Sequence, residues 1–420
     1  MSRPHLGSVG RKPLGFGRGI AGSEPPRLTH EPLVLANYFE WFQASHAWSQ
    51  WNVYGPLGHA WMPVMGEYAS NTASVIADHV RQFKRAGLDG ATLDYWGPTS
   101  ALSLDATLQA VLDAWEEAGL RYAVYYEPSS ILNPALLGKP AEYRQAMIDA
   151  GLNPDAPGSL YQAPFTEYSA GPVWQKYVLN PATGRYRDNY IWASPDGINF
   201  KPVLVLFDNC LDHDGNWIDG NHSNRTEANG VSFEILNKAF FCISPDLNLF
   251  SARTFDGGHR YNPIFLPGDN AANPSAPAWR AKCAQIEGLK GGAYKNKLFM
   301  ATVIPGYNDD GINRDIDTGA SGNCRARANG GFYDRYWRIL DEAVPAADMI
   351  FVTSFNEYGE GSGIEETATG LVGTLSWDLA YGQQYLDLTR EWSERWRKRK
   401  RAGGRQATRW LPNAGVAVPT

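Results

Sequence analysis

The chain has 420 residues, of which 43% are hydrophobic and 20% are charged, a balance that is typical of globular proteins and excludes a largely disordered one. The formal net charge of −6 gives no reason to expect a nucleic-acid partner. No apolar run is long enough to cross a bilayer, so no membrane partner is expected either.

The first 30 residues are predicted to be a flexible lead-in, because they contain basic residues, glycines and prolines but no apolar core of a signal peptide. We therefore expect a cytoplasmic protein, or a secreted one whose signal has been removed. The four cysteines stand far apart and lack zinc-site spacing, so they are expected to be buried free thiols, and no metal or cofactor is predicted. The abundance of Trp, Tyr and Phe favours a carbohydrate site, because aromatic faces stack on sugars.

Beyond residue 30, short β-rich runs alternate with amphipathic helical runs. The first helix shows the pattern well, because Val75, Ile76, Val80 and Phe83 recur at helical spacing before Gly87. Strands are predicted over residues 33–39, 90–96, 122–127, 201–207, 247–252, 298–304 and 349–355, with 371–377 as the candidate eighth strand. Helices are predicted over residues 72–86, 106–118, 139–151, 276–288, 332–343 and 381–400.

Strands that alternate with helices pair in parallel, because each crossover needs a helix. Seven or eight such repeats favour an α/β fold of the (β/α)8 TIM-barrel type over residues 31–402, with a long loop insertion over 152–200 and a tail over 403–420. An open doubly wound sheet is the alternative. A dinucleotide site is not expected, since the glycine-rich stretch 15–22 precedes no strand–helix unit. The basic run 395–401 is interpreted as a solvated helix end.

Carboxylates and aromatic residues gather where the predicted strands end, which in a barrel is the rim that holds the active site. Such a set fits acid–base cleavage of a sugar, with aromatic walls around the substrate. The candidate substrate-binding residues at these ends are Tyr38, Trp41, Tyr95, Trp96, Glu127, Asp208, Tyr307 and Asn356.

The segment 354–361 (Ser-Phe-Asn-Glu-Tyr-Gly-Glu-Gly) places Glu357 and Glu360 three residues apart just beyond a strand. If the chain turns tightly at Gly359, both carboxylates can face one pocket, and Gly359 and Gly361 leave the backbone free to turn. Two like charges so close together would raise the pKa of one of them, which leaves an acid beside a base. By spacing alone, a surface loop whose glutamates cap the next helix is an equally good interpretation.

Residues 301–366 resemble glycoside hydrolase family 99, the endo-α-mannosidase family, in three ordered motifs. The motifs are 305–309 (Pro-Gly-Tyr-Asn-Asp), the set Asn323, Arg325, Arg327, Asn329, Gly330 and Tyr333, and 353–361 (Thr-Ser-Phe-Asn-Glu-Tyr-Gly-Glu-Gly) followed by Ile364-Glu365. Weaker matches upstream are Trp51-Asn52, 66–70 (Gly-Glu-Tyr-Ala-Ser) and 255–257 (Phe-Asp-Gly), so Trp51 and Asn52 join the candidate substrate-binding residues.

The resemblance implies a retaining glycosidase in which the sugar's own 2-hydroxyl attacks the anomeric carbon and forms a 1,2-anhydro sugar. By motif match, Glu357 would remove the proton of that hydroxyl, and Glu360 would act as acid and then as base. Asn356 would orient the 2-hydroxyl or Glu357, and Tyr307 and Arg325 would lie near the substrate. Arg327 would lie near the site as well, or would pair with a structural carboxylate. An oligosaccharide or polysaccharide would be the substrate.

The sequence departs from the family pattern at positions that touch substrate in such barrels. Residues 39–42 read Phe-Glu-Trp-Phe in place of Tyr-Pro-Trp-Tyr, 207–210 read Phe-Asp-Asn-Cys in place of Tyr-Asp-Ser-Tyr, and Tyr358-Gly359 replaces Trp-His. A glycosidase of a different sugar, including a furanoside, is therefore an alternative.

Three further alternatives stay open. A non-catalytic glycan-binding or glycosyltransferase-associated barrel would be expected to lose one of the paired carboxylates, and both are present. A double-displacement glycosidase would pair Glu357 with Asp94, Glu127 or Asp208. A metal-dependent hydrolase is poorly supported, because the histidines lack ligand spacing, although His259 is a candidate lining residue of the pocket.

Overall fold

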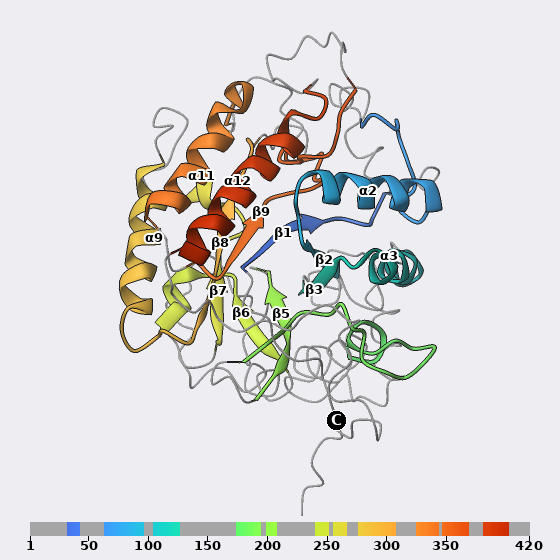
Figure 1. The fold of residues 1–420 in the computed structure, drawn as a ribbon, viewed down its shortest axis with the longest axis horizontal. Coiled ribbons are helices and arrows are strands. Elements are labelled where there is room, and N and C mark those ends of the chain that lie inside the picture. The colour runs from blue at the N-terminus through green and yellow to red at the C-terminus, as the bar shows by residue number, and fades with distance from the viewer. Residues whose placement is uncertain are drawn as a thin grey trace, which may run out of the picture.

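The structure is a computed structural model, and it describes residues 32–42, 63–95, 104–126, 174–194, 199–207, 240–251, 255–266, 276–307, 325–343, 347–368 and 381–402. These residues form a closed barrel surrounded by helices (Figure 1). The predicted lead-in, 1–30, and the predicted tail, 403–420, lie outside the described residues.

Eight parallel strands within the described ranges form the barrel. In chain order they are β1 (Leu33–Tyr38), β2 (Gly90–Tyr95), β3 (Arg121–Tyr126), β5 (Lys201–Leu206), β6 (Phe241–Ser244), β7 (Gly257–His259), β8 (Leu298–Val303) and β9 (Met349–Val352). Each strand pairs with the next, and β9 pairs with β1, which closes the sheet. The predicted (β/α)8 barrel is confirmed, and the open doubly wound sheet is excluded.

One strand prediction was wrong. Residues 247–252 were predicted as a strand, but Leu247–Ser251 form the 3-10 helix η6. The carboxylate of Asp246 accepts a hydrogen bond from the backbone N–H of Asn248 at 2.9 Å, which starts the helical turn. The strand in this part of the chain is β6, which lies before η6.

The sequence pattern missed β7, because two of its three residues are glycines that show no apolar alternation. A Cβ on Gly257 would lie 2.5 Å from the carbonyl oxygen of Leu298, and one on Gly258 would meet Phe250 and Leu247 at 3.1 and 3.2 Å. Close packing against β8 and η6 therefore requires glycine here. The eighth-strand candidate, 371–377, lies outside the described residues.

Five helices in the described ranges pack around the barrel. They are α2 (Ala73–Arg85), α3 (Leu104–Ala118), α9 (Pro277–Lys290), α11 (Gly331–Ala343) and α12 (Gln384–Ala402), and all five were predicted within a few residues. They follow one another around the wall in the order α9, α11, α12, α2 and α3 (Figure 1). The predicted helix at 139–151 lies outside the described residues.

The region 152–200, predicted as a loop insertion, has structure in its described part. It contains the π-helix η3 (Trp174–Val178) and the two-residue strand β4 (Trp192–Ala193), which pairs antiparallel with β5. Arg187 is buried in this segment and forms ion pairs with Asp113 and Glu116 of α3, both at 2.9 Å. The ion pairs of the buried Arg187 thus hold this segment against α3, on the outside of the barrel.

Strand register decides which side chains face the barrel interior, because paired residues in parallel strands point to the same side. Asn37 pairs with Thr92 and accepts a hydrogen bond from its hydroxyl at 2.6 Å inside the barrel. Tyr125 pairs with Asp94 and contacts the rings of His259 and Phe351, so these four residues also face inward. Their chain neighbours Tyr38, Tyr95 and Tyr126 consequently point outward, toward the helices.

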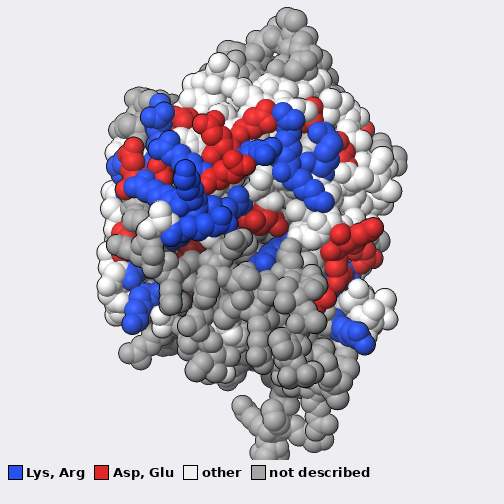
Figure 2. Space-filling view, viewed as in Figure 1, with Lys and Arg blue, Asp and Glu red and all other residues white. Residues whose placement is uncertain are grey.

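The basic run on α12 forms ion pairs at the surface. Arg395 and Arg399 bind Asp341 at 3.0 and 2.9 Å, and Arg397 binds Asp89 at 2.7 Å. Figure 2 shows the resulting mixture of positive and negative side chains on this face, over α12 and α2. Among the described helices, none combines the length and apolar character that crossing a bilayer requires.

Candidate active site

The chain makes a tight turn directly after β9, and this turn carries both predicted catalytic carboxylates. We call residues 354–361 the catalytic turn. The backbone N–H of Ser354 donates to the carbonyl of Ser362 at 2.9 Å, and that of Gly361 donates to the carbonyl of Tyr358 at 3.2 Å. Gly361 has φ of +56°, which glycine adopts readily. The chain therefore turns at Gly359, as expected, within residues 358–361, and the left-handed residue of that turn is Gly361.

Glu357 is buried, with 4% of its surface exposed. Its backbone N–H donates to the hydroxyl of Ser354 at 2.8 Å, and its carboxylate accepts a hydrogen bond from the backbone N–H of Gly359 at 2.8 Å. The carboxylate is thus held at a fixed position on the turn. Burial of this kind makes an ionisable group responsive to nearby charge, as a catalytic acid or base must be.

Glu360 is half-buried and lies between two phenols. Tyr261 donates to Oε2 at 2.9 Å, and Tyr307 donates to Oε1 at 3.3 Å. Burial, followed by the charges of Glu360 and Glu357, raises the pKa of Tyr261 well above its usual value, so this phenol keeps its proton. Both glutamates thus lie near enough to Tyr261 for their charges to raise the pKa of its phenol.

Tyr307 and Arg325 are brought together by an isolated antiparallel bridge. The backbone N–H of each donates to the carbonyl of the other, at 3.0 and 2.7 Å. Both side chains are buried, at 4% and 7% exposed. A Cβ on Gly306 would lie 2.5 Å from Cγ of Arg327, so glycine permits this close approach. The hydroxyl of Tyr307 donates to Glu360, so Tyr307 lies beside that carboxylate, and its substrate-binding role stays a prediction.

Arg327 supports the catalytic turn from its far side. Its Nη2 donates to the carbonyls of Gly361 and Gly363 at 2.9 and 2.6 Å. The guanidinium lies 4.7 and 4.6 Å from the ring centres of Tyr381 and Tyr385. The sequence had suggested a substrate contact or a structural carboxylate as its partner, and the contacts of Arg327 include two carbonyls and two aromatic faces.

Asn356 lies directly before Glu357 and is held by three hydrogen bonds. Its Oδ1 accepts from the backbone N–H of Phe39 at 2.8 Å, and its Nδ2 donates to the carbonyl of Phe39 at 2.7 Å and to the hydroxyl of Tyr68 at 3.3 Å. The side chain is fully buried. With both amide hydrogens engaged, Asn356 fastens the catalytic turn to the end of β1. Of its two predicted roles, which were to orient the 2-hydroxyl or Glu357, these contacts fit the second.

Tyr38 and Tyr95 were predicted to bind substrate, and strand register turns both away from the barrel interior. Tyr38 is fully buried among His79, Phe83 and Trp115 of the helical layer, and its hydroxyl lies 2.9 Å from Nδ1 of His79. Tyr95 packs edge-on against Tyr177 of η3. Both residues belong to the packing between barrel and helices, so the substrate-binding prediction was wrong for them.

Trp41 stacks on Phe39, with ring centres 4.4 Å apart and planes 25° from parallel, just beyond the end of β1. Its sugar-stacking role stays a prediction. Five further candidates, Trp51, Asn52, Trp96, Glu127 and Asp208, lie outside the described residues.

Tyr261 was not among the predicted site residues. It lies two residues beyond β7, and because this strand shows no apolar alternation, the sequence pattern did not place Tyr261 at a strand end. The nearby Phe-Asp-Gly motif at 255–257 was the available signal. His259, the last residue of β7, faces the barrel interior, where burial lowers its pKa to about 4, and its Nε2 is 3.0 Å from the carbonyl of Leu206. It is therefore a neutral interior residue.

Two carboxylates on one turn, at the C-terminal rim of a parallel (β/α)8 barrel, are the arrangement expected in a glycoside hydrolase. The model of glycosyl hydrolase family 99 matches residues 277–398, which include the catalytic turn, Tyr307 and Arg327. The protein is a glycoside hydrolase that is similar to those of family 99.

Relatives and solved structures extend the similarity along the chain. The glycoprotein endo-alpha-1,2-mannosidase of Mus musculus is 25% identical over 89% of this chain and 70% of its own length. The glycoprotein endo-alpha-1,2-mannosidase-like protein of Danio rerio is 24% identical over 88% of this chain and 76% of its own. The structure of a family 99 endo-alpha-mannosidase from Bacteroides thetaiotaomicron covers 89% of this chain and 99% of its own, with a TM-score of 0.55 and 19% identity, and it supports the barrel fold.

Proposed function

We propose that this enzyme cleaves an α-mannosidic linkage in a glycan with retention of configuration, through participation of the sugar's 2-hydroxyl. The names of the curated relatives support mannose as the sugar. The observation that carries the mechanism is that Glu357 and Glu360 occupy one turn, with Glu357 fixed by a backbone N–H and Glu360 placed between two phenols.

The two phenols suit a carboxyl group that changes its protonation state twice in one catalytic cycle. A phenol oxygen both donates and accepts hydrogen bonds. Ionised Glu360 accepts from Tyr261 and Tyr307, while protonated Glu360 can donate to one of them and accept from the other. Glu360 thus keeps both hydrogen bonds in either state, which fits a group that acts as acid and then as base.

In the first step, the Glu357 carboxylate takes the proton of the 2-hydroxyl. The freed oxygen attacks the anomeric carbon, the bond to the leaving oxygen breaks, and Glu360 gives its proton to that oxygen. The products are a 1,2-anhydro sugar and the released glycan, with Glu357 now protonated and Glu360 ionised. A good acid is needed because a glycosidic oxygen is a poor leaving group.

In the second step, Glu360 removes a proton from water, and the water oxygen attacks the anomeric carbon. The three-membered ring opens, and Glu357 returns its proton to the 2-oxygen. Both carboxyl groups regain their starting states, and two displacements at one carbon give net retention.

The decisive experiment combines product configuration with a 2-fluoro analogue. NMR of the first-formed product from an α-mannoside should show the α anomer. A 2-deoxy-2-fluoro mannoside with a good leaving group should bind without turnover, because it lacks the attacking hydroxyl. A glycosyl ester on Glu357 found by mass spectrometry would instead establish double displacement, and a β product would exclude both retaining routes.

A further inference from the structure

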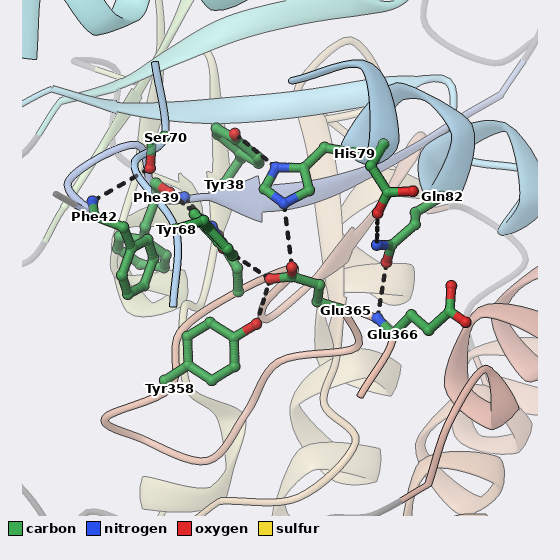
Figure 3. Close-up of polar contacts among 12 residues, drawn as sticks. Tyr38, Phe39, Phe42, Tyr68, Ser70, His79, Gln82, Tyr358, Glu365 and Glu366 are labelled. Carbon is green, nitrogen blue, oxygen red and sulfur yellow. Dashed lines mark hydrogen bonds and ion pairs between the residues drawn. The ribbon is translucent and has the colours of Figure 1, made fainter. Parts of the chain in front are cut away.

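A fully buried carboxylate lies behind the catalytic turn and accepts three hydrogen bonds. Glu365 is 0% exposed, and it accepts from the hydroxyl of Tyr68 at 2.8 Å, from the hydroxyl of Tyr358, and from Nε2 of His79 at 3.1 Å. Figure 3 shows the two phenols and the imidazole converging on this one carboxylate. We call Glu365, His79, Tyr38, Tyr68 and Tyr358 the Glu365 cluster.

Hydrogen bonding in the cluster runs in one direction toward Glu365. Nδ1 of His79 lies 2.9 Å from the hydroxyl of Tyr38, and Nε2 lies 3.1 Å from Oε1 of Glu365, so the imidazole connects Tyr38 to Glu365. Burial, followed by the charge of Glu365, raises the pKa of Tyr38, Tyr68 and Tyr358 well above the usual value, so all three phenols remain donors. Replacing Glu365 by an apolar residue would leave three buried donors without an acceptor.

The cluster forms a closed ring with the catalytic turn. The hydroxyl of Tyr68, which donates to Glu365, also accepts from Nδ2 of Asn356 at 3.3 Å. Tyr358 donates to the same carboxylate oxygen as Tyr68. Asn356 and Tyr358 are the two chain neighbours of Glu357, so the residues on both sides of Glu357 are held by one buried acceptor.

Two further contacts make this ring rigid. The backbone N–H of Glu365 donates to the carbonyl of Phe355 at 2.9 Å, which ties the cluster to the start of the turn. The ring of Tyr358 packs edge-on against Phe42, with centres 5.4 Å apart. A displacement of Tyr358 would therefore break both an apolar contact and a hydrogen bond to a charged acceptor, and such bonds are the stronger kind.

We propose that Glu365 is a positioning residue for catalysis, which holds Asn356 through Tyr68, holds Tyr358 directly, and so fixes the direction in which Glu357 points. This inference rests on the proposed role of Glu357 as the base for the 2-hydroxyl. Tyr358 stands where the family pattern has tryptophan, and in this chain its phenol connects the catalytic turn to Glu365.

The first test is Tyr358→Phe, which removes the hydroxyl and keeps the ring against Phe42. We expect kcat to fall about 10- to 100-fold with KM within about threefold of wild type, because a small misplacement of a catalytic group has effects of this size. The loss should be equal for natural and activated leaving groups, since Glu357 acts on the 2-hydroxyl whatever group departs. Tyr68→Phe should behave in the same way.

The matched control is Tyr190→Phe. The hydroxyl of Tyr190 is also buried and donates to a carbonyl, that of Val203, at 2.7 Å, but it lies between β3 and β5, away from the catalytic turn. Its loss should lower thermal stability to a similar degree and leave kcat at the wild-type value. A fall in kcat in the control as large as that in Tyr358→Phe would mean that general loosening of the fold explains both.

A second measurement needs no substrate. Hydrogen exchange followed by mass spectrometry should show faster exchange of the amides of residues 354–365 in Tyr358→Phe and Tyr68→Phe, and unchanged exchange there in Tyr190→Phe. Unchanged exchange in the first two variants, or wild-type kcat in Tyr358→Phe, would overturn the inference. If the wild-type enzyme cleaves no mannoside, the proposed function fails, while the exchange measurement still decides whether the cluster holds the turn.

Discussion

The hydroxyl of Tyr261 donates a hydrogen bond to Oε2 of Glu360 at 2.9 Å, and the two residues come from segments that follow different strands, β7 and β9. The barrel brings them together because the C-terminal ends of parallel strands meet at one rim. This contact fixes the rotamer of the carboxylate that the proposed mechanism uses as acid and base.

Tyr261→Phe should therefore reduce kcat by about 10-fold or more, with a smaller effect on KM, because Glu360 loses a donor that stabilises its ionised state after proton transfer. The effect should be larger for a substrate with a poor leaving group than for an activated aryl glycoside. Steady-state kinetics with both substrates measure this. An equal fall in kcat on both substrates would show that Tyr261 does not act through Glu360.

Glu357→Gln and Glu360→Gln should each lower activity by about 10²- to 10⁴-fold while the fold is retained. An activated leaving group should partly restore the activity of Glu360→Gln, because such a group needs little protonation. The same substrate should not restore Glu357→Gln. Circular dichroism and thermal melting check that the fold is retained. If the activated substrate restored Glu357→Gln and not Glu360→Gln, the acid would be Glu357 and the base Glu360.

Arg327→Lys should lower thermal stability and kcat together. Lysine keeps the positive charge but lacks the planar group that reaches the carbonyls of Gly361 and Gly363 while it lies against Tyr381 and Tyr385. We expect a loss of about 1–3 kcal/mol in the free energy of unfolding, as for other disrupted buried polar contacts. Denaturant titration measures it, and wild-type stability in the variant would show that the contacts are dispensable.

Glu40 should make stability depend on pH. It is 1% exposed, and among the described residues neither of its oxygens has a hydrogen-bond partner. Burial raises its pKa well above the usual value. The folded state therefore holds this proton more tightly than the unfolded state, so the stability linked to it is complete below the unfolded pKa and is lost as the pH rises through the folded pKa.

Glu40→Gln removes this titration and should be as stable as wild type near pH 4. At pH 8 it should be more stable, by about 1–3 kcal/mol, since a buried group without partners is unfavourable when charged. Thermal melts of both proteins across this pH range give the comparison. A constant difference in stability at every pH would show that Glu40 does not titrate in this range.

Tyr38→Phe should lower stability by about 1 kcal/mol and leave KM unchanged, because its hydroxyl contacts His79 in the helical layer and not the barrel interior. Parallel measurements of KM and melting temperature test this placement. A selective rise in KM with unchanged stability would return Tyr38 to the substrate-binding residues.

The sequence by itself determined the alternation of strands and helices, the barrel, and the position of Glu357 and Glu360 just beyond a strand. These features depend on local signals: apolar runs such as 298–304, helical spacing such as Val75, Ile76, Val80 and Phe83, and two glutamates three residues apart in a recognisable motif. Such signals are complete within a few consecutive residues, so they can be identified before the chain is folded.

Only the tertiary structure decided which neighbouring residue faces the site. Strand register turns Tyr38 and Tyr95 outward and Tyr125 inward, although all three lie near strand ends. The hydrogen bond from Tyr261 to Glu360 joins residues 99 positions apart in the chain, and the one from Tyr68 to Glu365 joins residues 297 positions apart. Partners so distant leave no pattern in the local sequence, because their contact exists only after the barrel closes between β9 and β1.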